Sequence, residues 1–150
     1  MSGTILYGPR YAGKTSFVAT IPSIWAIYTT GTTVDVVQSW AQFVEKVDRI
    51  VEQNLDASAY IDTLNDLYEM CVEHICEEMG EEHPLTAGNN KPLIWKAVKA
   101  EMKEVLYRLD EAATHVWYIC GQETKEIDST LHKGTVIYPK MDWVLEDIMP

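Results

Sequence analysis

Close to its start the chain carries the stretch Gly8-Pro9-Arg10-Tyr11-Ala12-Gly13-Lys14-Thr15. Its spacing, G-x-x-x-x-G-K-[ST], is that of a phosphate-binding loop. Glycines allow the backbone to turn tightly, so that successive N–H groups point inward at phosphate oxygens. The Lys14 ammonium would reach the β- and γ-phosphates, and the Thr15 hydroxyl would ligate Mg²⁺. The motif therefore predicts a nucleotide as the ligand.

The residues on either side of the loop favour the same interpretation. Residues 4–7 (TILY) are typical of a strand that enters the loop, and residues 15–20 (TSFVAT) of a helix that leaves it. The N-terminus of such a helix favours anions. The alternative is a glycine-rich turn that carries Lys and Thr by coincidence. The predicted nucleotide-binding residues are Gly8, Pro9, Arg10, Tyr11, Ala12, Gly13, Lys14, Thr15 and Ser16.

Length and composition indicate one domain with a buried core, spanning residues 1–150. No apolar run approaches the roughly 18–20 residues that a membrane helix needs. The strand predicted directly after Met1 leaves no room for a signal peptide. The three cysteines lack CxxC spacing and are interpreted as reduced thiols rather than metal ligands. We therefore expect a cytoplasmic protein with no membrane partner.

The charge balance limits the partners that the chain can have. A net charge of −11 argues against a broad nucleic-acid surface, because non-specific affinity comes from Lys and Arg that neutralise phosphates. A local basic strip, or one built by oligomerisation, remains open. The only arginines are Arg10, Arg49 and Arg108.

Strand-like and helix-like segments alternate along the chain. Between residues 34 and 54, apolar side chains recur every three or four positions, which indicates an amphipathic helix. Helices separated by short apolar runs imply an α/β fold: a mainly parallel sheet with helices on both faces. We expect strands at 3–7, 24–28, 57–61, 115–120 and 135–138, helices at 15–20, 34–54, 63–79 and 92–113, and polar connections at 81–91 and 121–134.

Three polar side chains follow predicted strands, where ligands of parallel sheets bind. Asp62 ends the third strand and is predicted to hold Mg²⁺ together with Thr15; the alternative is a cap of the next helix. Gln122 follows the fourth strand and is predicted to contact the γ-phosphate or the attacking water. Glu123 beside it is an alternative acid for polarising water. The predicted catalytic residues are Lys14, Gln122 and Glu123, and the predicted metal ligands are Thr15 and Asp62.

Basic residues near these positions have two interpretations. Arg10 lies within the loop and could approach phosphates or a neighbouring subunit, or face solvent. Lys125, Lys133 and Lys140 cluster after Gln122. They could act on a neighbouring subunit's nucleotide, contact nucleic acid, or belong to a solvated loop.

The loop at 8–15, residues 60–69 (YIDTLNDLYE), the helix that carries Trp95 and the strand end 119–123 (ICGQE) together resemble a known group. The chain is similar to phage-encoded RecA-like P-loop ATPases, AAA-type nucleotide-binding proteins related to ATP-dependent single-strand annealing proteins. The resemblance covers nearly the whole chain. It implies a RecA-like P-loop core, ATP with Mg²⁺, self-assembly into rings or filaments, and a role in phage DNA recombination or repair in the host cytoplasm.

The chain departs from that group in two places. Family members commonly carry an acidic residue after the second strand, in a stretch like D-T-E-G, where the glutamate activates water. The matching stretch here is YTTG at 28–31, with Thr30 in place of the glutamate, and threonine cannot act as a general base near neutral pH. Family members also usually continue through further strands, which leaves open whether residues 1–150 are a natural short form or a truncated one.

Three functions therefore compete. The first is an oligomeric ATPase of DNA recombination that uses ATP and Mg²⁺, with single-stranded DNA as a candidate partner. In the second, ATP or ADP binds without turnover and the bound state controls assembly. The third is a small-molecule kinase, which the scarcity of arginines disfavours because nucleotide kinases close an arginine-rich lid over the phosphates.

Overall fold

The computed structural model describes residues 2–9, 12–21, 24–30, 36–53, 56–128, 133–139 and 141–150. Four parallel strands form its main sheet, and their spatial order is β1-β4-β3-β2. The strands are β1 (Ser2–Tyr7), β2 (Ile24–Tyr28), β3 (Ser58–Asp62) and β4 (His115–Cys120). β4 therefore lies between the strand that enters the phosphate loop and the strand that ends at Asp62.

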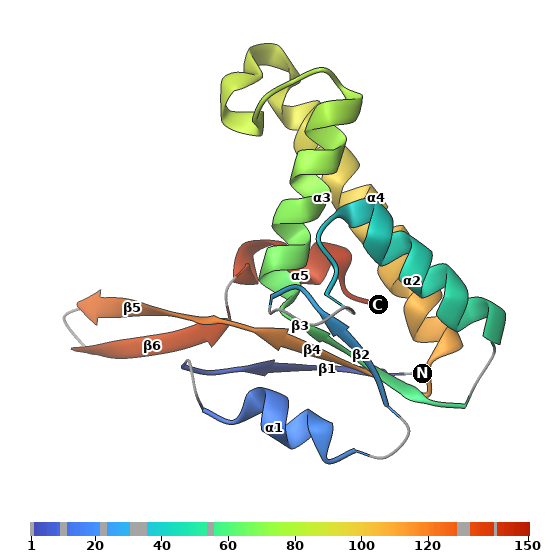
Figure 1. Ribbon diagram of the computed structural model, residues 1–150. Helices are drawn as coiled ribbons and strands as arrows, with labels where there is room; N and C mark the ends of the chain where they lie inside the picture. Colours follow the sequence, from blue (N-terminus) through green and yellow to red (C-terminus); the bar gives the residue numbers. More distant parts are fainter. Residues whose placement is uncertain are drawn as a thin grey trace.

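Helices cover both faces of the sheet, as the sequence predicts (Figure 1). The short helix α1 lies on one face, and α2, α3, α4 and α5 lie on the other. Alternate residues of each strand serve the two faces, because successive side chains of a strand point to opposite sides. On β3, Tyr60 packs with Val18 of α1, whereas Ala59 and Ile61 belong to the larger core under the other helices. The bounds are α1 (Lys14–Ala19), α2 (Trp40–Gln53), α3 (Leu64–Glu78), α4 (Lys91–Ala112) and α5 (Asp142–Ile148).

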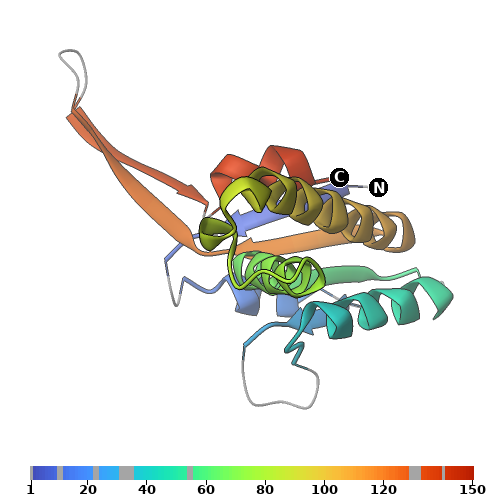
Figure 2. The same ribbon diagram turned by 90° about the horizontal axis from the view of Figure 1, so that it is seen from above.

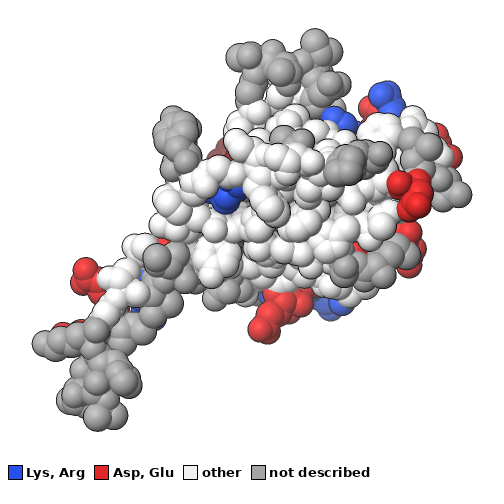
Figure 3. All heavy atoms as spheres, turned by 90° about the horizontal axis from the view of Figure 1, so that it is seen from below, with Lys and Arg blue, Asp and Glu red and all other residues white. Residues whose placement is uncertain are grey.

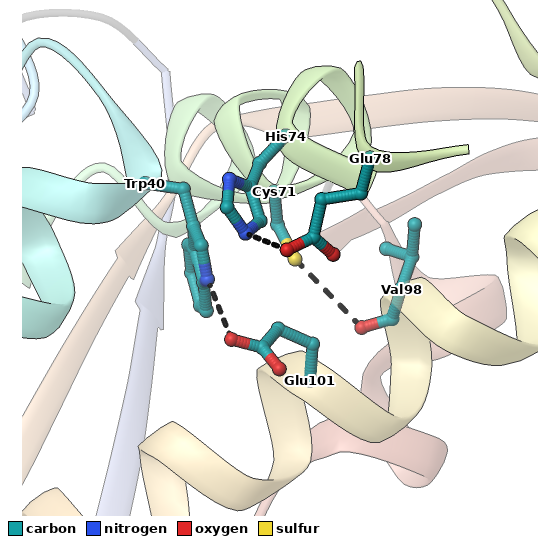
Figure 4. A network of polar contacts seen from close by, with 6 residues as sticks. All are labelled: Trp40, Cys71, His74, Glu78, Val98 and Glu101. Atoms are coloured by element: carbon teal, nitrogen blue, oxygen red, sulfur yellow. Dashed lines mark hydrogen bonds and ion pairs between the residues drawn. The ribbon is translucent and has the colours of Figure 1, made fainter. Parts of the chain in front are cut away.

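Polar contacts tie the larger helical layer together. The Trp40 indole of α2 donates a hydrogen bond of 2.9 Å to Glu101 of α4, and the Cys71 thiol of α3 reaches the Val98 carbonyl at 3.8 Å (Figure 4). His74 lies 3.4 Å from Glu78 within α3. The two contacts between helices satisfy polar groups next to the core, so these helices pack in one register above the sheet.

The stretch after β4 is a β-hairpin, not the polar connection predicted for residues 121–134. β5 (Gln122–Asp128) and β6 (Lys133–Pro139) pair antiparallel and project away from the main sheet (Figure 2). Both faces of a projecting ribbon contact water, so its strands need no apolar alternation. The prediction failed for β5 because short apolar runs were the signal used to identify strands, whereas the strand predicted at 135–138 lies within β6.

Helix α2 begins at Trp40, six residues later than predicted. Val36 bridges to Tyr28, and the Val37 N–H donates to the Tyr28 carbonyl at 2.8 Å, so this segment extends beside the sheet. The Ser39 hydroxyl then accepts from the Gln42 N–H at 3.3 Å and caps the helix. Apolar spacing alone could not separate Val37, which is buried against the sheet, from the helix that follows.

Helix α3 ends at Glu78, and a glycine follows its C-cap. Gly80 has a φ of 69°, in the left-handed region, and its N–H donates to the Glu77 carbonyl while the Glu81 N–H donates to Cys76. Two short 3₁₀ turns, Pro84–Thr86 and Gly88–Asn90, then lead into α4. In the part of the chain that the structure describes, no helix combines the length and apolar character needed to cross a membrane.

Gly80→Ala is expected to lower the free energy of unfolding by about 1 kcal/mol, because a side chain at positive φ strains the backbone. A Cβ at Gly80 would meet no atom within 4 Å, so the cost would come from the backbone alone. Gly134→Ala is the matched control: its Cβ also meets open space, and its φ lies outside the left-handed region. Urea unfolding measures both variants, and equal midpoints would contradict this account.

Candidate functional site

A cavity of about 550 Å³ opens at the carboxyl ends of β1, β3 and β4. Its volume suits a nucleotide-sized ligand. The segments that line it are far apart in the sequence and meet because parallel strands end at the same edge of the sheet. The lining residues that the argument uses are Lys14, Thr15, Thr30, Asp62, Asp66 and Gln122.

The phosphate loop turns tightly between β1 and α1. The Ala12 N–H donates to the Pro9 carbonyl at 3.2 Å, and Gly13 adopts a φ of 87°, which glycine reaches without strain. Gly13 has no side chain to cap α1, and its carbonyl accepts from the Phe17 N–H at 2.9 Å. Residues 12–16, which belong to this turn and the start of α1, also line a second cavity of about 310 Å³. Arg10 and Tyr11 lie outside the described residues.

The Lys14 side chain folds back over the loop. Its ammonium donates to the Gly8 carbonyl at 2.9 Å and to the Pro9 carbonyl at 2.8 Å. Both acceptors precede it on the same turn, so the loop itself aims the charge at the mouth of the cavity. Among the described residues that line the cavity, Lys14 supplies the positive charge, and Asp62 and Asp66 supply two negative charges.

Thr15 and Asp62 meet as the sequence predicts. The Thr15 hydroxyl donates to an Asp62 carboxylate oxygen at 2.5 Å, across 47 residues of sequence. One group begins α1 and the other ends β3, so the contact joins the phosphate loop to the third strand. Both are oxygen donors of the kind that Mg²⁺ prefers. Within the described ranges, no group of three or more His, Cys, Asp or Glu side chains could hold a metal ion.

A second carboxylate, that of Asp66, is held by hydrogen bonds near Asp62. Asp66, in the first turn of α3, accepts from the Thr63 hydroxyl at 2.8 Å and from the Thr29 hydroxyl at 3.2 Å. Thr29 is buried directly after β2 and accepts from the Thr63 N–H at 2.8 Å. Its hydroxyl proton is shared between Asp66 and the Asp62 carbonyl, which lies at 3.1 Å. The Asn65 amide reaches the other Asp66 oxygen at 3.3 Å. Three side chains thus set the orientation of this carboxylate.

Asn65 connects the third strand to the fourth. The side-chain oxygen of Asn65, Oδ1, accepts a hydrogen bond of 3.1 Å from the Gly121 N–H. Gly121 lies between β4 and β5, directly before Gln122. The contact therefore holds the start of the hairpin against the cavity.

The two predicted polar residues after β4 are placed differently. Gln122 is partly buried and lines the cavity, whereas Glu123 is exposed and is not among the lining residues. Neighbouring side chains of a strand emerge on opposite faces, which explains the difference. Thr30, at the position where a glutamate was expected, also lines the cavity.

A buried thiol lies beneath the loop. Burial raises the pKa of Cys120, at the end of β4, to about 12, and the nearby Lys14 charge acts in the opposite direction. The thiol is therefore neutral at physiological pH and contributes no charge to the cavity. Burial, with the neighbouring Tyr28 hydroxyl, likewise raises the pKa of Tyr60 on the α1 side of the sheet.

The face that α1 covers carries few charges. In Figure 3, which views this face, most of the described surface belongs to uncharged residues, and acidic and basic atoms gather mainly at its margins. Phe17 of α1 is 53% exposed here and packs edge-on against Trp117. The described part of this face thus offers no basic stripe that could track a nucleic-acid backbone.

Sequence reasoning missed Thr29, Asn65 and Asp66. Two sequence signals indicate these residues in retrospect. Asn65 and Asp66 belong to a Thr-x-x-Asp capping pattern at 63–66, and Thr29 directly follows a predicted strand. The position of Thr29 after a strand end does not by itself indicate its contact with Thr63, because only the pairing of β2 with β3 brings the two together.

The match to known families agrees with this geometry. Residues 3–149 match the family described as AAA domain. No curated protein matches the sequence.

Asn65→Ala is expected to speed amide hydrogen exchange at Gly121 and to lower the free energy of unfolding by about 1–2 kcal/mol, because it leaves a partly buried N–H unpaired. The control is Asn89→Ala in an exposed turn, which should change stability by less than about 0.5 kcal/mol. Exchange at Gly121 that stays at the wild-type rate would show that the contact does not hold the hairpin start.

Proposed function

This chain belongs to the AAA domain family, which makes it a nucleotide-binding P-loop domain of ATPase type, and we propose that it hydrolyses ATP with Mg²⁺ as a RecA-like ATPase of DNA recombination or single-strand annealing. One observation carries the proposal. Lys14, Thr15 and Asp62 converge on a single cavity at the carboxyl edge of a parallel sheet.

The loop binds the triphosphate. Backbone N–H groups of residues 12–16 face a cavity of their own and contact phosphate oxygens. The Lys14 ammonium exchanges the Gly8 and Pro9 carbonyls for β- and γ-phosphate oxygens, which form stronger bonds because both partners are charged.

Mg²⁺ fits the donor set beside the loop. The Thr15 hydroxyl oxygen would be a direct ligand, and its proton already points to Asp62, which would hold a metal-bound water. When bound, the ion neutralises phosphate charge in the transition state. Two carboxylates against one ammonium leave the described lining negative, so we expect ATP to bind far more tightly with the cation than without it.

Assembly into an oligomer would complete the site. Arg49 pairs with Glu45 at 2.5 Å and Arg108 pairs with Asp48 at 2.8 Å, so both arginines that the structure describes belong to the helical layer rather than to the cavity. A Lys or Arg from a neighbouring copy would supply the positive charge that phosphoryl transfer needs. The same placement disfavours a small-molecule kinase, which would need arginines over the phosphates.

The DNA-linked role is supported by the resemblance and by the hairpin. β5 starts at the cavity with Gln122 and carries an exposed lysine, Lys125, away from the sheet. Gln122 would therefore report the γ-phosphate to a projecting element suited to contact a second molecule. With a net charge of −11, contacts to single-stranded DNA would have to be local.

Thr30 favours a second candidate, a nucleotide-gated module. Its hydroxyl lines the cavity at the position expected to hold a water-activating glutamate. Without another base, ATP would bind and control assembly but would not turn over.

Mg²⁺-dependent ATP turnover, measured with and without single-stranded DNA, separates the two candidates. We expect turnover that increases with DNA and is lost in Lys14→Ala, because the variant lacks the ammonium that binds the β- and γ-phosphates. EDTA should abolish turnover in the wild type. Lys46→Ala, on α2, is the matched control for removing a lysine outside the phosphate loop.

Nucleotide binding without turnover would instead support the gated module. Phosphate transfer to a small acceptor would support the kinase, and turnover that persists in Lys14→Ala would contradict the assigned site.

A further inference from the structure

ATP hydrolysis needs a group that orients water and accepts its proton. Among the described residues that line the cavity, the carboxylates are Asp62 and Asp66. Asp62 is engaged by the Thr15 hydroxyl at 2.5 Å, in the place suited to Mg²⁺. Gln122 can orient a water, but its amide is not a base, and Glu123 lies exposed outside the lining. Asp66 is the carboxylate that remains.

The Asp66 carboxylate has one acceptor position that receives no hydrogen bond from the described residues. Each carboxylate oxygen can accept about two hydrogen bonds. Oδ2 accepts from Thr63 at 2.8 Å and from Thr29 at 3.2 Å, and Oδ1 accepts from Asn65 at 3.3 Å. The remaining acceptor site is therefore on Oδ1. The side chain is held by Thr29, which follows β2, and by Thr63 and Asn65 at the start of α3.

A capping role alone explains only part of this arrangement. The Asp66 N–H donates to the Thr63 hydroxyl at 3.4 Å, which caps α3 without the carboxylate. The bond from Thr29, which lies 37 residues away and directly after β2, adds nothing to the cap. Thr29 directly precedes Thr30 and so fixes Asp66 beside the position where a glutamate was expected.

We propose that Asp66 activates the attacking water through Oδ1 and takes the place of the missing glutamate; this inference rests on the proposed ATPase function. The water oxygen forms a bond to the γ-phosphorus while the bond from that phosphorus to the β–γ bridging oxygen breaks, and the bridging oxygen leaves with the electron pair on ADP. One water proton passes to Asp66 Oδ1. That proton then moves to phosphate or solvent, which restores the carboxylate.

The test is single-turnover hydrolysis of Mg²⁺-ATP by wild type, Asp66→Asn and Glu73→Gln. Binding of a fluorescent ATP analogue and thermal unfolding are measured on the same samples. Asp66→Asn keeps the size of the side chain and removes the base. We expect its hydrolysis to fall by about 10²-fold or more while binding changes only a few-fold. Glu73→Gln removes an exposed carboxylate of the same helix that does not line the cavity, and it should hydrolyse at the wild-type rate.

Asp66→Ala with added formate gives a second readout that folding alone would not move. If Asp66 serves as the proton acceptor, formate should restore part of the lost turnover, whereas a purely structural carboxylate would not be replaced in this way. Wild-type rates in Asp66→Asn, or absence of rescue in a folded Asp66→Ala that binds the analogue, would overturn the assignment. Absence of turnover in the wild type would overturn the ATPase function first, and this inference with it.

Discussion

The hydrogen bond from Thr15 to Asp62 is the contact on which the arrangement of the site depends. It joins the first turn after the phosphate loop to the end of β3, although β4 lies between β1 and β3 in the sheet. The loop and the aspartate can meet only if all these strands run parallel and end at one edge. The pairing of β1 with β4 and of β4 with β3 therefore aligns the two halves of the site.

The same edge concentrates charge in an acidic protein. Asp62 and Asp66 lie in the cavity with Lys14, so a triphosphate meets more negative than positive charge unless a divalent cation accompanies it. The hydrogen bonds that fix Asp66 come from Thr29, Thr63 and Asn65, side chains that lie on two segments of backbone near Asp62. The site is thus held by short polar residues rather than by ion pairs.

Much of this architecture could be predicted from the sequence, because local signals specify it. Buried strands such as 24–28 and 115–120 are continuous apolar runs, and the loop at 8–15 has a fixed spacing. The hairpin, the start of α2 at Trp40 and the role of Thr29 could not be predicted. Each depends on a pairing that no local pattern marks: β6 with β5, Val37 with Tyr28, and Thr29 with Asp66. Such pairings produce no periodic pattern of apolar residues in the sequence.

The most direct test of the central claim is a crystal structure of the protein with Mn²⁺ and a slowly hydrolysed ATP analogue, with the cation located from its anomalous signal. The account predicts Mn²⁺ on the Thr15 hydroxyl with Asp62 reached directly or through one water, and a γ-phosphate oxygen within hydrogen-bond distance of Lys14. A triphosphate bound away from residues 8–15, or a cation remote from both Thr15 and Asp62, would contradict it.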